Sequence, residues 1–178
     1  MTQRAICIWM TGLSGSGKTT IATALKEILH ENRFFCVIID GDDLRQGVSV
    51  GLSFTLQDRA ENAFRAAQFA KILVNNNVIA LVTLISPTHI IRKMAHDIVG
   101  DAFHLVYVNT PIAVCEDRDV KGLYSKARAG LIKDFTGIDS PFEKPLLPET
   151  MISTQEKTPK ECAGLIYKRI YSYIYENN

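Results

Sequence analysis

The chain has 178 residues, of which 47% are hydrophobic and 22% are charged, and its formal net charge is +1. This composition is ordinary for a globular protein, and the length suits one domain with its own core, over residues 1–178. A net charge this close to zero excludes the broad positive field that binds nucleic acid or an anionic membrane. Charged binding sites on this protein are therefore expected to be local.

The cysteines are widely spaced and form no C-x-x-C pair. They are Cys7, Cys36, Cys115 and Cys162. This spacing fits reduced thiols of a core rather than a disulfide framework or a zinc site. The N-terminal residues carry no signal-peptide pattern, and no apolar run approaches the length of a membrane span. We therefore expect a cytoplasmic protein with no membrane partner and no nucleic-acid partner.

Apolar runs alternate with helical periodicities along the chain, which is the signature of an α/β fold. The first apolar run, residues 5–10, is typical of a buried parallel strand. The helix after it carries an apolar face from Ile21 to Leu29. A second strand over residues 36–39 ends on Asp40, and a polar, glycine-containing connection is expected after it.

Between the first strand and the first helix, residues 12–19 read G-L-S-G-S-G-K-T and fit the phosphate-binding loop pattern G-x-x-x-x-G-K-[ST]. The glycines allow successive backbone N–H groups to face one anion. Lys18 is expected between the β- and γ-phosphates and the Thr19 hydroxyl on Mg²⁺, with the helix dipole aimed at the same place. A turn that contains a lysine by chance is the weaker interpretation, because strand, loop and helix come in the required order. The sequence therefore predicts a nucleoside triphosphate site.

The later elements continue the alternation. A long helix ends at the asparagines of residues 75–77, and a third strand covers residues 78–85. A helix to about Val99 precedes a fourth strand at residues 103–108, and a short helix begins at Pro111. The pattern predicts a central parallel sheet flanked by helices.

The connection over residues 119–148 is rich in charge, glycine and proline, and only one short helix is expected in it, near residues 124–129. Long structured connections are commonly functional lids. Basic residues in or beside it that could close over a polyanion are Arg118, Lys121, Lys126, Arg128 and Lys133. A solvated basic loop is the alternative. After a short stretch at residues 150–153, a helix is expected from Thr158 to about Tyr175, with a core row of Ala163, Ile166, Ile170 and Ile174.

Substrate sites of open parallel sheets lie beyond the carboxyl ends of the strands, so Asp40 is the leading candidate for chemistry. It could accept a proton from an attacking hydroxyl or hold Mg²⁺ through water, although Asp-Gly-Asp is also common in turns. Arg45, Arg59 and Arg65 bring guanidinium groups that suit phosphate or sulfate. Phe54 could be a buried anchor or could stack on a base. These residues indicate a small-molecule phosphotransferase; a guanine signature is missing, and no acidic residue ends the third strand as a motor ATPase requires.

Several short segments carry a more specific pattern. They are residues 40–42 (D-G-D), 58–62 (D-R-A-E-N), 85–87 (I-S-P), 118–124 (R-D-V-K-G-L-Y), 126–128 (K-A-R) and 135–138 (F-T-G-I). With these segments, from Trp9 to about Pro145, the chain resembles the adenylylsulfate kinase family. That resemblance implies a three-layer P-loop kinase fold with a lid. It also implies MgATP-dependent phosphorylation of the 3′-hydroxyl of adenosine 5′-phosphosulfate (APS) to 3′-phosphoadenosine 5′-phosphosulfate, a step of sulfate assimilation.

The resemblance and the loop pattern together assign the site. Residues expected to bind ATP are Gly12, Leu13, Ser14, Gly15, Ser16, Gly17, Lys18, Thr19, Thr20 and Arg118. Residues expected to bind APS are Asp40, Asp42, Arg45, Phe54, Arg59, Asn62, Ile85, Ser86, Lys121 and Phe135. Within this set the resemblance implies that Phe54 and Phe135 sandwich the adenine and that Lys121 approaches the phosphates from the lid. Asp40, Lys18 and Ser86 are the catalytic candidates, and Thr19 is the metal ligand.

Ser86 matches a serine to which the family assigns a phosphoenzyme intermediate. We expect direct in-line transfer with Asp40 as the base, because transfer to a hydroxyl beside a carboxylate needs no covalent step. A serine before Pro87 could also be the N-cap of the helix that follows. The resemblance further implies a homodimer and association with ATP sulfurylase.

Departures from the family pattern lie near the acceptor side of the site. Asp43 stands where Asn is usual, Phe64 where a basic residue is usual, and residues 51–53 read G-L-S where Leu-Gly is usual. Two alternatives therefore stay open. One is a relative that acts on a different activated nucleotide or a small polyol. The other is a nucleotide-binding module without catalysis, against which the complete catalytic set argues.

Overall fold

The computed structural model describes residues 3–119 and 121–175; Val120, within one of the segments quoted above, lies outside the described residues. The middle layer is a parallel five-stranded sheet with the strand order β2-β3-β1-β4-β5. The strands are β1 (Cys7–Thr11), β2 (Cys36–Asp40), β3 (Ile79–Thr83), β4 (Phe103–Val108) and β5 (Thr150–Ile152). The predicted α/β class is confirmed.

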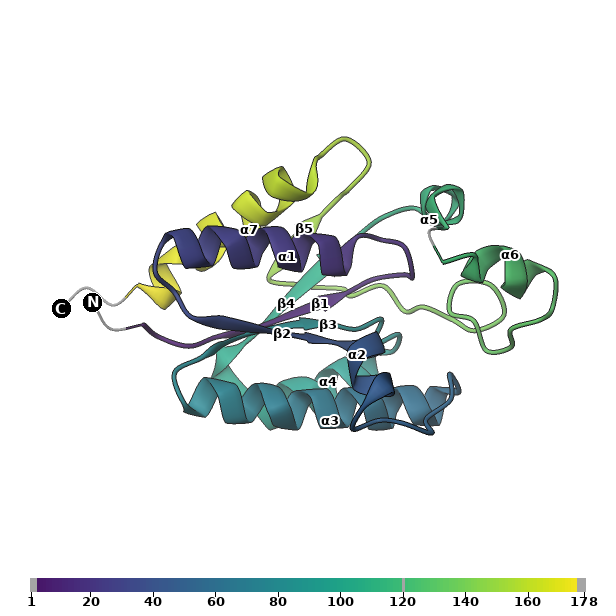
Figure 1. Ribbon diagram of the computed structural model, residues 1–178, viewed down its shortest axis with the longest axis horizontal. Coiled ribbons are helices and arrows are strands. Elements are labelled where there is room, and N and C mark those ends of the chain that lie inside the picture. The colour runs from purple at the N-terminus through teal and green to yellow at the C-terminus, as the bar shows by residue number, and fades with distance from the viewer. Residues whose placement is uncertain (1–2, 120, 176–178) are drawn as a thin grey trace.

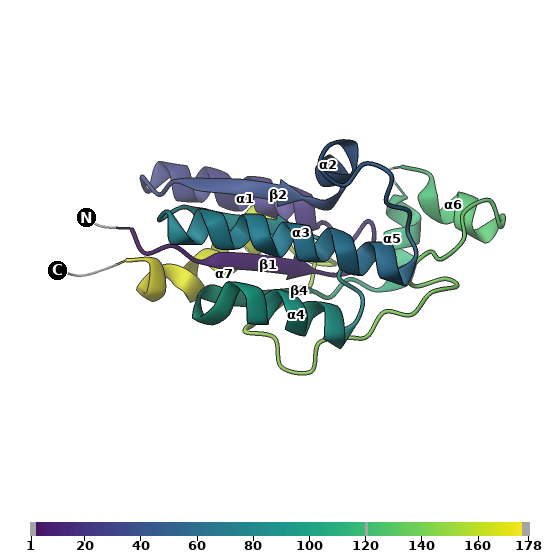
Figure 2. The same cartoon turned by 90° about the horizontal axis from the view of Figure 1, so that it is seen from below.

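Helices cover both faces of the sheet. They are α1 (Lys18–Glu31), α2 (Gly41–Gln46), α3 (Leu56–Asn75), α4 (His89–Val99), η1 (a 3-10 turn, Gly100–Ala102), α5 (Ile112–Arg118), α6 (Leu123–Arg128) and α7 (Pro159–Ile174). Figure 1 shows α1 and α7 above the sheet and α3 and α4 below it, and the view in Figure 2 agrees. The short helices α2, α5 and α6 gather at one end of the sheet, where the strands end.

Strand β1 is buried along its whole length, which explains why its sequence is apolar throughout. Alternate side chains point to opposite faces of a strand. Ile8 and Met10 join the core under α1 and α7, whereas Cys7 and Trp9 join the core over α3 and α4. The two layers of helices therefore rest on the two faces of one central strand.

Helix α3 meets the sheet through alanines. Ala63, Ala66, Ala67 and Ala70 are fully buried, so this helix approaches the strands closely. Phe64, which lies next to them in sequence, is 42% exposed because it points away from the sheet. On α7 the expected core row is confirmed, since its alanine and isoleucines are all buried: Ala163, Ile166, Ile170 and Ile174.

Two local predictions were wrong. The connection after Asp40 contains helix α2, which has no buried residue and therefore leaves no apolar periodicity in the sequence. The N-cap of α4 is Thr88, whose Oγ1 accepts from the N–H of Ile91 at 3.3 Å, and Ser86 is not the cap. Ser86 instead turns the chain between β3 and α4 with φ of 37°.

The 119–148 connection has its own small core, in which Tyr124, Ala127 and Phe135 pack with Cys115 of α5. The short helix expected in it is α6, and Figure 1 places α6 beyond the ends of the strands. All four cysteines are buried and free, as their spacing predicted. Among the described residues, no helix combines the length and the apolar character that a membrane crossing needs.

The buried row of α7 gives a test of the core. Replacing Ile166, which is fully buried, by Ala should lower the free energy of unfolding by about 2–5 kcal/mol, because it leaves a cavity under α1 and α7. The matched control is Leu165→Ala on the same helix, where the side chain is 43% exposed and the loss should be roughly 1 kcal/mol or less. Urea unfolding followed by circular dichroism measures both, and equal losses would contradict the assignment of this face to the core.

Candidate active site

A cavity of about 650 Å³ lies beyond the carboxyl ends of the strands. The loop between β1 and α1 forms its floor, α2 and α3 form one wall, and the 119–148 connection forms another. This is where an open parallel sheet is expected to bind its ligands. The cavity brings together residues that are far apart in the sequence.

The loop of residues 12–19 has the backbone of an anion cradle. Gly15 and Gly17 have φ of 71° and 100°, which only glycine adopts without strain. At Gly12, a Cβ atom would come within 2.7 Å of the carbonyl oxygen of Val108, so the close approach of the loop to β4 excludes a side chain. Helix α1 begins at Lys18, directly after these glycines.

Lys18 lies across this loop. Its Nζ donates to the carbonyl oxygens of Gly12 at 2.9 Å and Leu13 at 2.7 Å. Burial lowers the pKa of Lys18 to about 8, although the carboxylates of Asp40 and Asp42 oppose that shift. The ammonium is therefore poorly compensated in the protein alone, and a phosphate anion beside it would supply the missing charge.

Polar side chains that follow β4 and β5 hold the loop in place. Thr110 Oγ1 and Thr154 Oγ1 both donate to the carbonyl oxygen of Ser16, at 3.1 and 3.3 Å. Arg118 in turn donates to the hydroxyl and to the carbonyl oxygen of Thr154, each at 2.9 Å. These contacts hold the Ser16 carbonyl oxygen in place and so help to fix the conformation of the loop.

Asp40 links this loop to the neighbouring strand. Its Oδ2 accepts from the hydroxyls of Thr19 at 2.7 Å and Thr83 at 2.6 Å, and its Oδ1 accepts from the N–H of Asp42 at 2.8 Å. Burial by itself raises the pKa of Asp40, but these hydrogen bonds outweigh it, so the pKa lies below its ordinary value. Asp40 is therefore a carboxylate at neutral pH, and it caps α2 as well as facing the cavity.

The wall opposite the loop is basic and aromatic. The guanidinium carbons of Arg45 and Arg59 lie 4.8 and 5.4 Å from the ring centre of Phe54, which is 46% exposed. Burial and the neighbouring charge of Arg45 lower the pKa of Arg59 to about 10. Asn62, also on α3, donates to the carbonyl oxygen of Gly41 at 3.4 Å. Its Oδ1 is buried without a hydrogen-bond partner among the described residues.

The 119–148 connection touches both sides of the cavity. Lys121 forms an ion pair with Asp42 of α2. Tyr124 of α6 donates its hydroxyl to the carbonyl oxygen of Ser14 in the loop at 2.9 Å. Arg59 of α3 donates to the carbonyl oxygen of Asp134 at 3.3 Å. The connection is therefore tied to the loop on one side and to α2 and α3 on the other.

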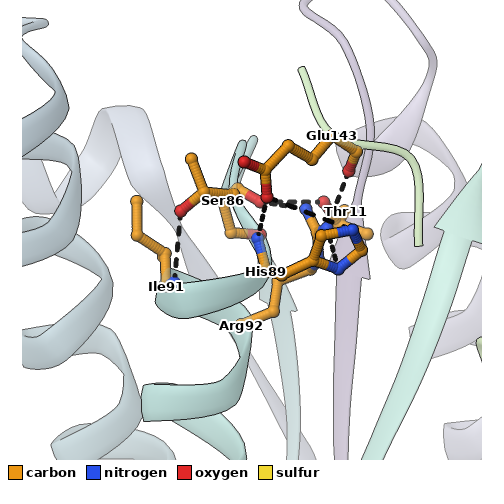
Figure 3. A network of polar contacts seen from close by, with 7 residues as sticks. Thr11, Ser86, His89, Ile91, Arg92 and Glu143 are labelled. Atoms are coloured by element: carbon orange, nitrogen blue, oxygen red, sulfur yellow. Dashed lines mark hydrogen bonds and ion pairs between the residues drawn. The ribbon is translucent and has the colours of Figure 1, made fainter. Parts of the chain in front are cut away.

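The turn after β3 closes the remaining side. Thr11 donates to the carbonyl oxygen of Ile85 at 2.6 Å, and Trp9 Nε1 donates to Ser86 Oγ at 3.0 Å. Figure 3 shows Ser86 and Thr11 within a network that reaches α4. The hydroxyl of Ser86 is buried, and its partners, Trp9 Nε1 and the carbonyl oxygen of Leu84, are not bases. Within residues 3–119 and 121–175, Ser86 therefore has no hydrogen bond to a base of the kind that a nucleophilic serine needs.

A family model described as adenylylsulphate kinase matches residues 4–153. This chain belongs to the adenylylsulphate kinase family. An adenylyl-sulfate kinase of Bacteroides fragilis (strain YCH46) is 51% identical over 153 residues, which are 85% of this chain and 76% of that protein. A probable adenylyl-sulfate kinase of Synechocystis sp. is 45% identical over 175 residues, 98% of either chain. The resemblance drawn from the short segments is confirmed.

A solved structure supports the same family at the level of the fold. It is that of the Mycobacterium tuberculosis APS kinase CysC in complex with AMPPNP and APS, with a TM-score of 0.91 and 39% identity, and the match covers 95% of this chain and 99% of that one. The three-layer P-loop kinase fold expected from the sequence is thereby confirmed. The two chains share this fold over nearly their whole lengths.

Most residues assigned from the sequence line the cavity. Those lining it are Ser14, Gly15, Gly17, Lys18, Thr19, Thr20, Asp40, Asp42, Arg45, Phe54, Arg59, Asn62, Ile85, Ser86, Arg118 and Lys121. Those outside its lining are Gly12, Leu13, Ser16 and Phe135. The first three belong to the loop itself. Phe135 is 6% exposed, and its ring packs edge-on against that of Tyr124, with the two ring centres 4.9 Å apart. The structure therefore does not bring Phe135 to the same wall as Phe54. The aromatic sandwich implied by the resemblance stays a prediction.

Sequence reasoning missed several polar residues of the adenylylsulphate kinase site. Thr83 holds Asp40, and Thr110 and Thr154 hold the loop. Threonine is common in strands and near their ends, so these residues carry no local signal. Only the position directly at or after a strand end could have singled them out, by the rule that had already selected Asp40.

The residues present fit a magnesium ion whose coordination comes mainly from the phosphates of a bound nucleotide and from water. Among the described residues, no group of three or more His, Cys, Asp or Glu side chains is placed to hold a metal ion. Mg²⁺ in kinases needs few protein ligands, because phosphates and waters complete its octahedron. Thr19 Oγ1 and the Asp40 carboxylate are oxygen donors 2.7 Å apart beside the loop, which is the donor chemistry that Mg²⁺ prefers.

The pKa of Lys18 gives a test of the nucleotide site. Since burial lowers it to about 8, Lys18 should be mostly neutral in the free protein at about pH 9 and should regain its proton beside phosphates. Binding of MgADP should therefore take up close to one proton at about pH 9, and much less near pH 7, where Lys18 is already charged. Calorimetry in two buffers of different ionisation enthalpy measures the uptake.

The control for this measurement is a lysine away from the cavity. Lys71→Met, an exposed position on α3, should keep the uptake, whereas Lys18→Met should lose it. The same uptake in the Lys18 variant and in the unmodified protein would show that another group takes the proton.

Proposed function

We propose that this protein transfers the γ-phosphoryl group of ATP to the 3′-hydroxyl of APS. The observation that carries the proposal is the position of the Asp40 carboxylate, between the phosphate loop on one side and the wall of Arg45, Phe54 and Arg59 on the other. A carboxylate placed there faces both a triphosphate and an acceptor. The relatives named adenylyl-sulfate kinase, and the solved relative with both ligands bound, support this choice of acceptor.

On the donor side, the loop N–H groups and Lys18 bind the phosphates of ATP. Lys18 exchanges its contacts with loop carbonyls for the β- and γ-phosphates, and Arg118, which lines the mouth of the cavity beside Thr154, lies within reach of the rest of the nucleotide. Thr19, with Asp40 through water, would hold Mg²⁺, which when bound neutralises charge on the β- and γ-phosphates. These groups stabilise the transferring phosphoryl by position and charge rather than by covalent chemistry.

On the acceptor side, the basic wall matches the charge of the phosphosulfate. Arg45 and Arg59 present forked guanidinium groups to an anion, and the lowered pKa of Arg59 reflects a charge that such an anion would compensate. The Oδ1 of Asn62, which has no hydrogen-bond partner in the described part of the chain, is suited to accept from a ribose hydroxyl. Phe54 offers a half-exposed aromatic face for the adenine.

Asp40 is the base of the proposed reaction, and transfer is direct. As the 3′-hydroxyl attacks in line, its proton moves to the Asp40 carboxylate. The low pKa of Asp40 makes it a weak base, so the proton transfers late, when the oxygen has already bonded to phosphorus. Ser86 remains a wall residue of the acceptor side, consistent with its lack of a neighbouring base.

The 119–148 connection serves as the lid of this single kinase domain. In the structure Lys121 pairs with Asp42, and both line the cavity, so substrate phosphates can take over that lysine when the connection closes. Closure excludes water, which protects the phosphoryl group from hydrolysis.

We infer the cellular location of the enzyme from its cysteines, and its oligomeric state and partner from its family. Four buried free cysteines fit the reducing cytoplasm. We infer a homodimer from the family resemblance, which light scattering on a size-exclusion column tests directly. Association with ATP sulfurylase, which would supply APS, is a further proposal of the same kind, testable by co-purification.

The proposed activity has a direct assay. ADP should be released from MgATP only when APS is added, and the product should carry a new 3′-phosphate by phosphorus NMR. An acceptor screen that includes other activated nucleotides and small polyols serves as the comparison. Turnover with one of those, and none with APS, would reject the acceptor proposed here while leaving the kinase assignment intact.

Asp40→Asn tests the base. The amide keeps the shape and some hydrogen bonds but cannot take the proton, so kcat should fall by roughly 10³-fold or more. The matched control is Asp97→Asn, where the aspartate is exposed and pairs with Lys93 on α4, and kcat should be unchanged. Near-normal kcat in the Asp40 variant would remove it as the base.

A further inference from the structure

Arg92 of α4 is a buried arginine outside the cavity. Its side chain is 4% exposed, and it is not among the residues that line the cavity. Burial lowers its pKa, and the neighbouring Glu143 carboxylate opposes that shift. A buried guanidinium is costly unless its donors are satisfied, so the identity of its partners shows what this residue does.

The partners of Arg92 come from two separate segments. One terminal nitrogen donates to the carbonyl oxygen of Ser86 at 2.7 Å, and the other donates to the carbonyl oxygen of Glu143 at 2.7 Å. The second nitrogen also donates to His89 Nδ1 at 3.1 Å. Figure 3 shows the guanidinium of Arg92 between these groups. The planar guanidinium of Arg92, called the fork below, therefore joins the turn after β3 to the end of the 119–148 connection.

Contacts around the fork reinforce the same junction. The N–H of Glu143 donates to the carbonyl oxygen of Pro87 at 2.8 Å, and the Glu143 carboxylate accepts from the N–H of His89 at 2.6 Å. The ring of Phe142 lies 5.9 Å from the guanidinium carbon of Arg92 and stacks on Tyr107 of β4. The connection is thus held at this end by several contacts at once.

The turn that Arg92 holds is a wall of the acceptor site. Ile85 and Ser86 line the cavity, and Ser86 has a φ of 37°, which is unusual for a residue with a side chain. Such a conformation persists only when its surroundings fix it. Arg92 donates to the carbonyl oxygen of Ser86 at 2.7 Å and Thr11 donates to that of Ile85 at 2.6 Å, so the fork contributes directly to fixing this turn.

We propose that Arg92 is a positioning residue that couples the acceptor wall at Ile85–Ser86 to the end of the 119–148 connection. The inference rests on the proposed function for its substrate, although the coupling itself does not. The nucleotide loop is held by a different set, Thr110, Thr154 and Arg118. Loss of the fork should therefore disturb acceptor binding and leave ATP binding intact.

The kinetic test compares two adjacent residues of α4. In Arg92→Met the KM for APS should rise roughly 10- to 100-fold, as expected for the loss of charge-assisted hydrogen bonds, and the KM for ATP should change by less than about twofold. In Lys93→Met, an exposed position, both should stay unchanged. Arg92→Lys keeps the charge but not the paired donors of the guanidinium, so its KM for APS should lie between those of the other two variants. Equal changes in the two KM values, or an unchanged KM for APS, would overturn the proposal.

A second measurement does not depend on the substrate. Hydrogen exchange should become at least about tenfold faster over residues 140–144 and 85–89 in Arg92→Met, and in neither segment of Lys93→Met. Faster exchange in only one of the two segments, or in neither, would also overturn the coupling. If the unmodified protein fails to phosphorylate APS, the proposed function fails, and the exchange result still decides whether Arg92 joins the two segments.

Discussion

The contact on which the site depends is the carboxylate of Asp40 with the two threonine hydroxyls that donate to it. Thr19 belongs to the start of α1 and Thr83 to the end of β3, so one side chain fixes the spacing between the phosphate loop, β2 and its neighbouring strand. The same carboxylate caps α2, which carries Asp42 and Arg45 into the cavity. The Asp40 carboxylate therefore contacts both the donor side and the acceptor side of the cavity. Its hydrogen bonds, rather than a flexible loop, set the distance between the two sides.

The sequence predicted the parts of this molecule that have a period or a fixed spacing. Strands buried on both faces are continuous apolar runs, α7 shows its row of buried isoleucines, and the loop has its glycines at required positions. Helix α2 was missed because it buries nothing, and its residues serve the cavity instead of the core. Thr154 and Arg92 were missed for a related reason: each acts through one long-range contact, which no local pattern records.

The site contains buried cationic side chains although the formal net charge of the whole chain is only +1. Lys18 and Arg59 both have lowered pKa values because burial removes water from their charges. Each of these groups is less stable as a cation in the protein alone than in water, and an anionic ligand reverses that penalty. A few buried cations can therefore supply binding energy for two anionic ligands, and the protein surface as a whole does not need to be positively charged.

The hydroxyl of Thr154 has a consequence for how the protein is made. It supports the carbonyl oxygen of Ser16 from 138 residues further along the chain, together with Arg118. While the ribosome is still extending the polypeptide, the glycine-rich segment and Thr110 have already been synthesised, yet Thr154 has not. A nascent chain that stops short of β5 thus carries the complete nucleotide-binding sequence with only part of the hydrogen bonding that holds it.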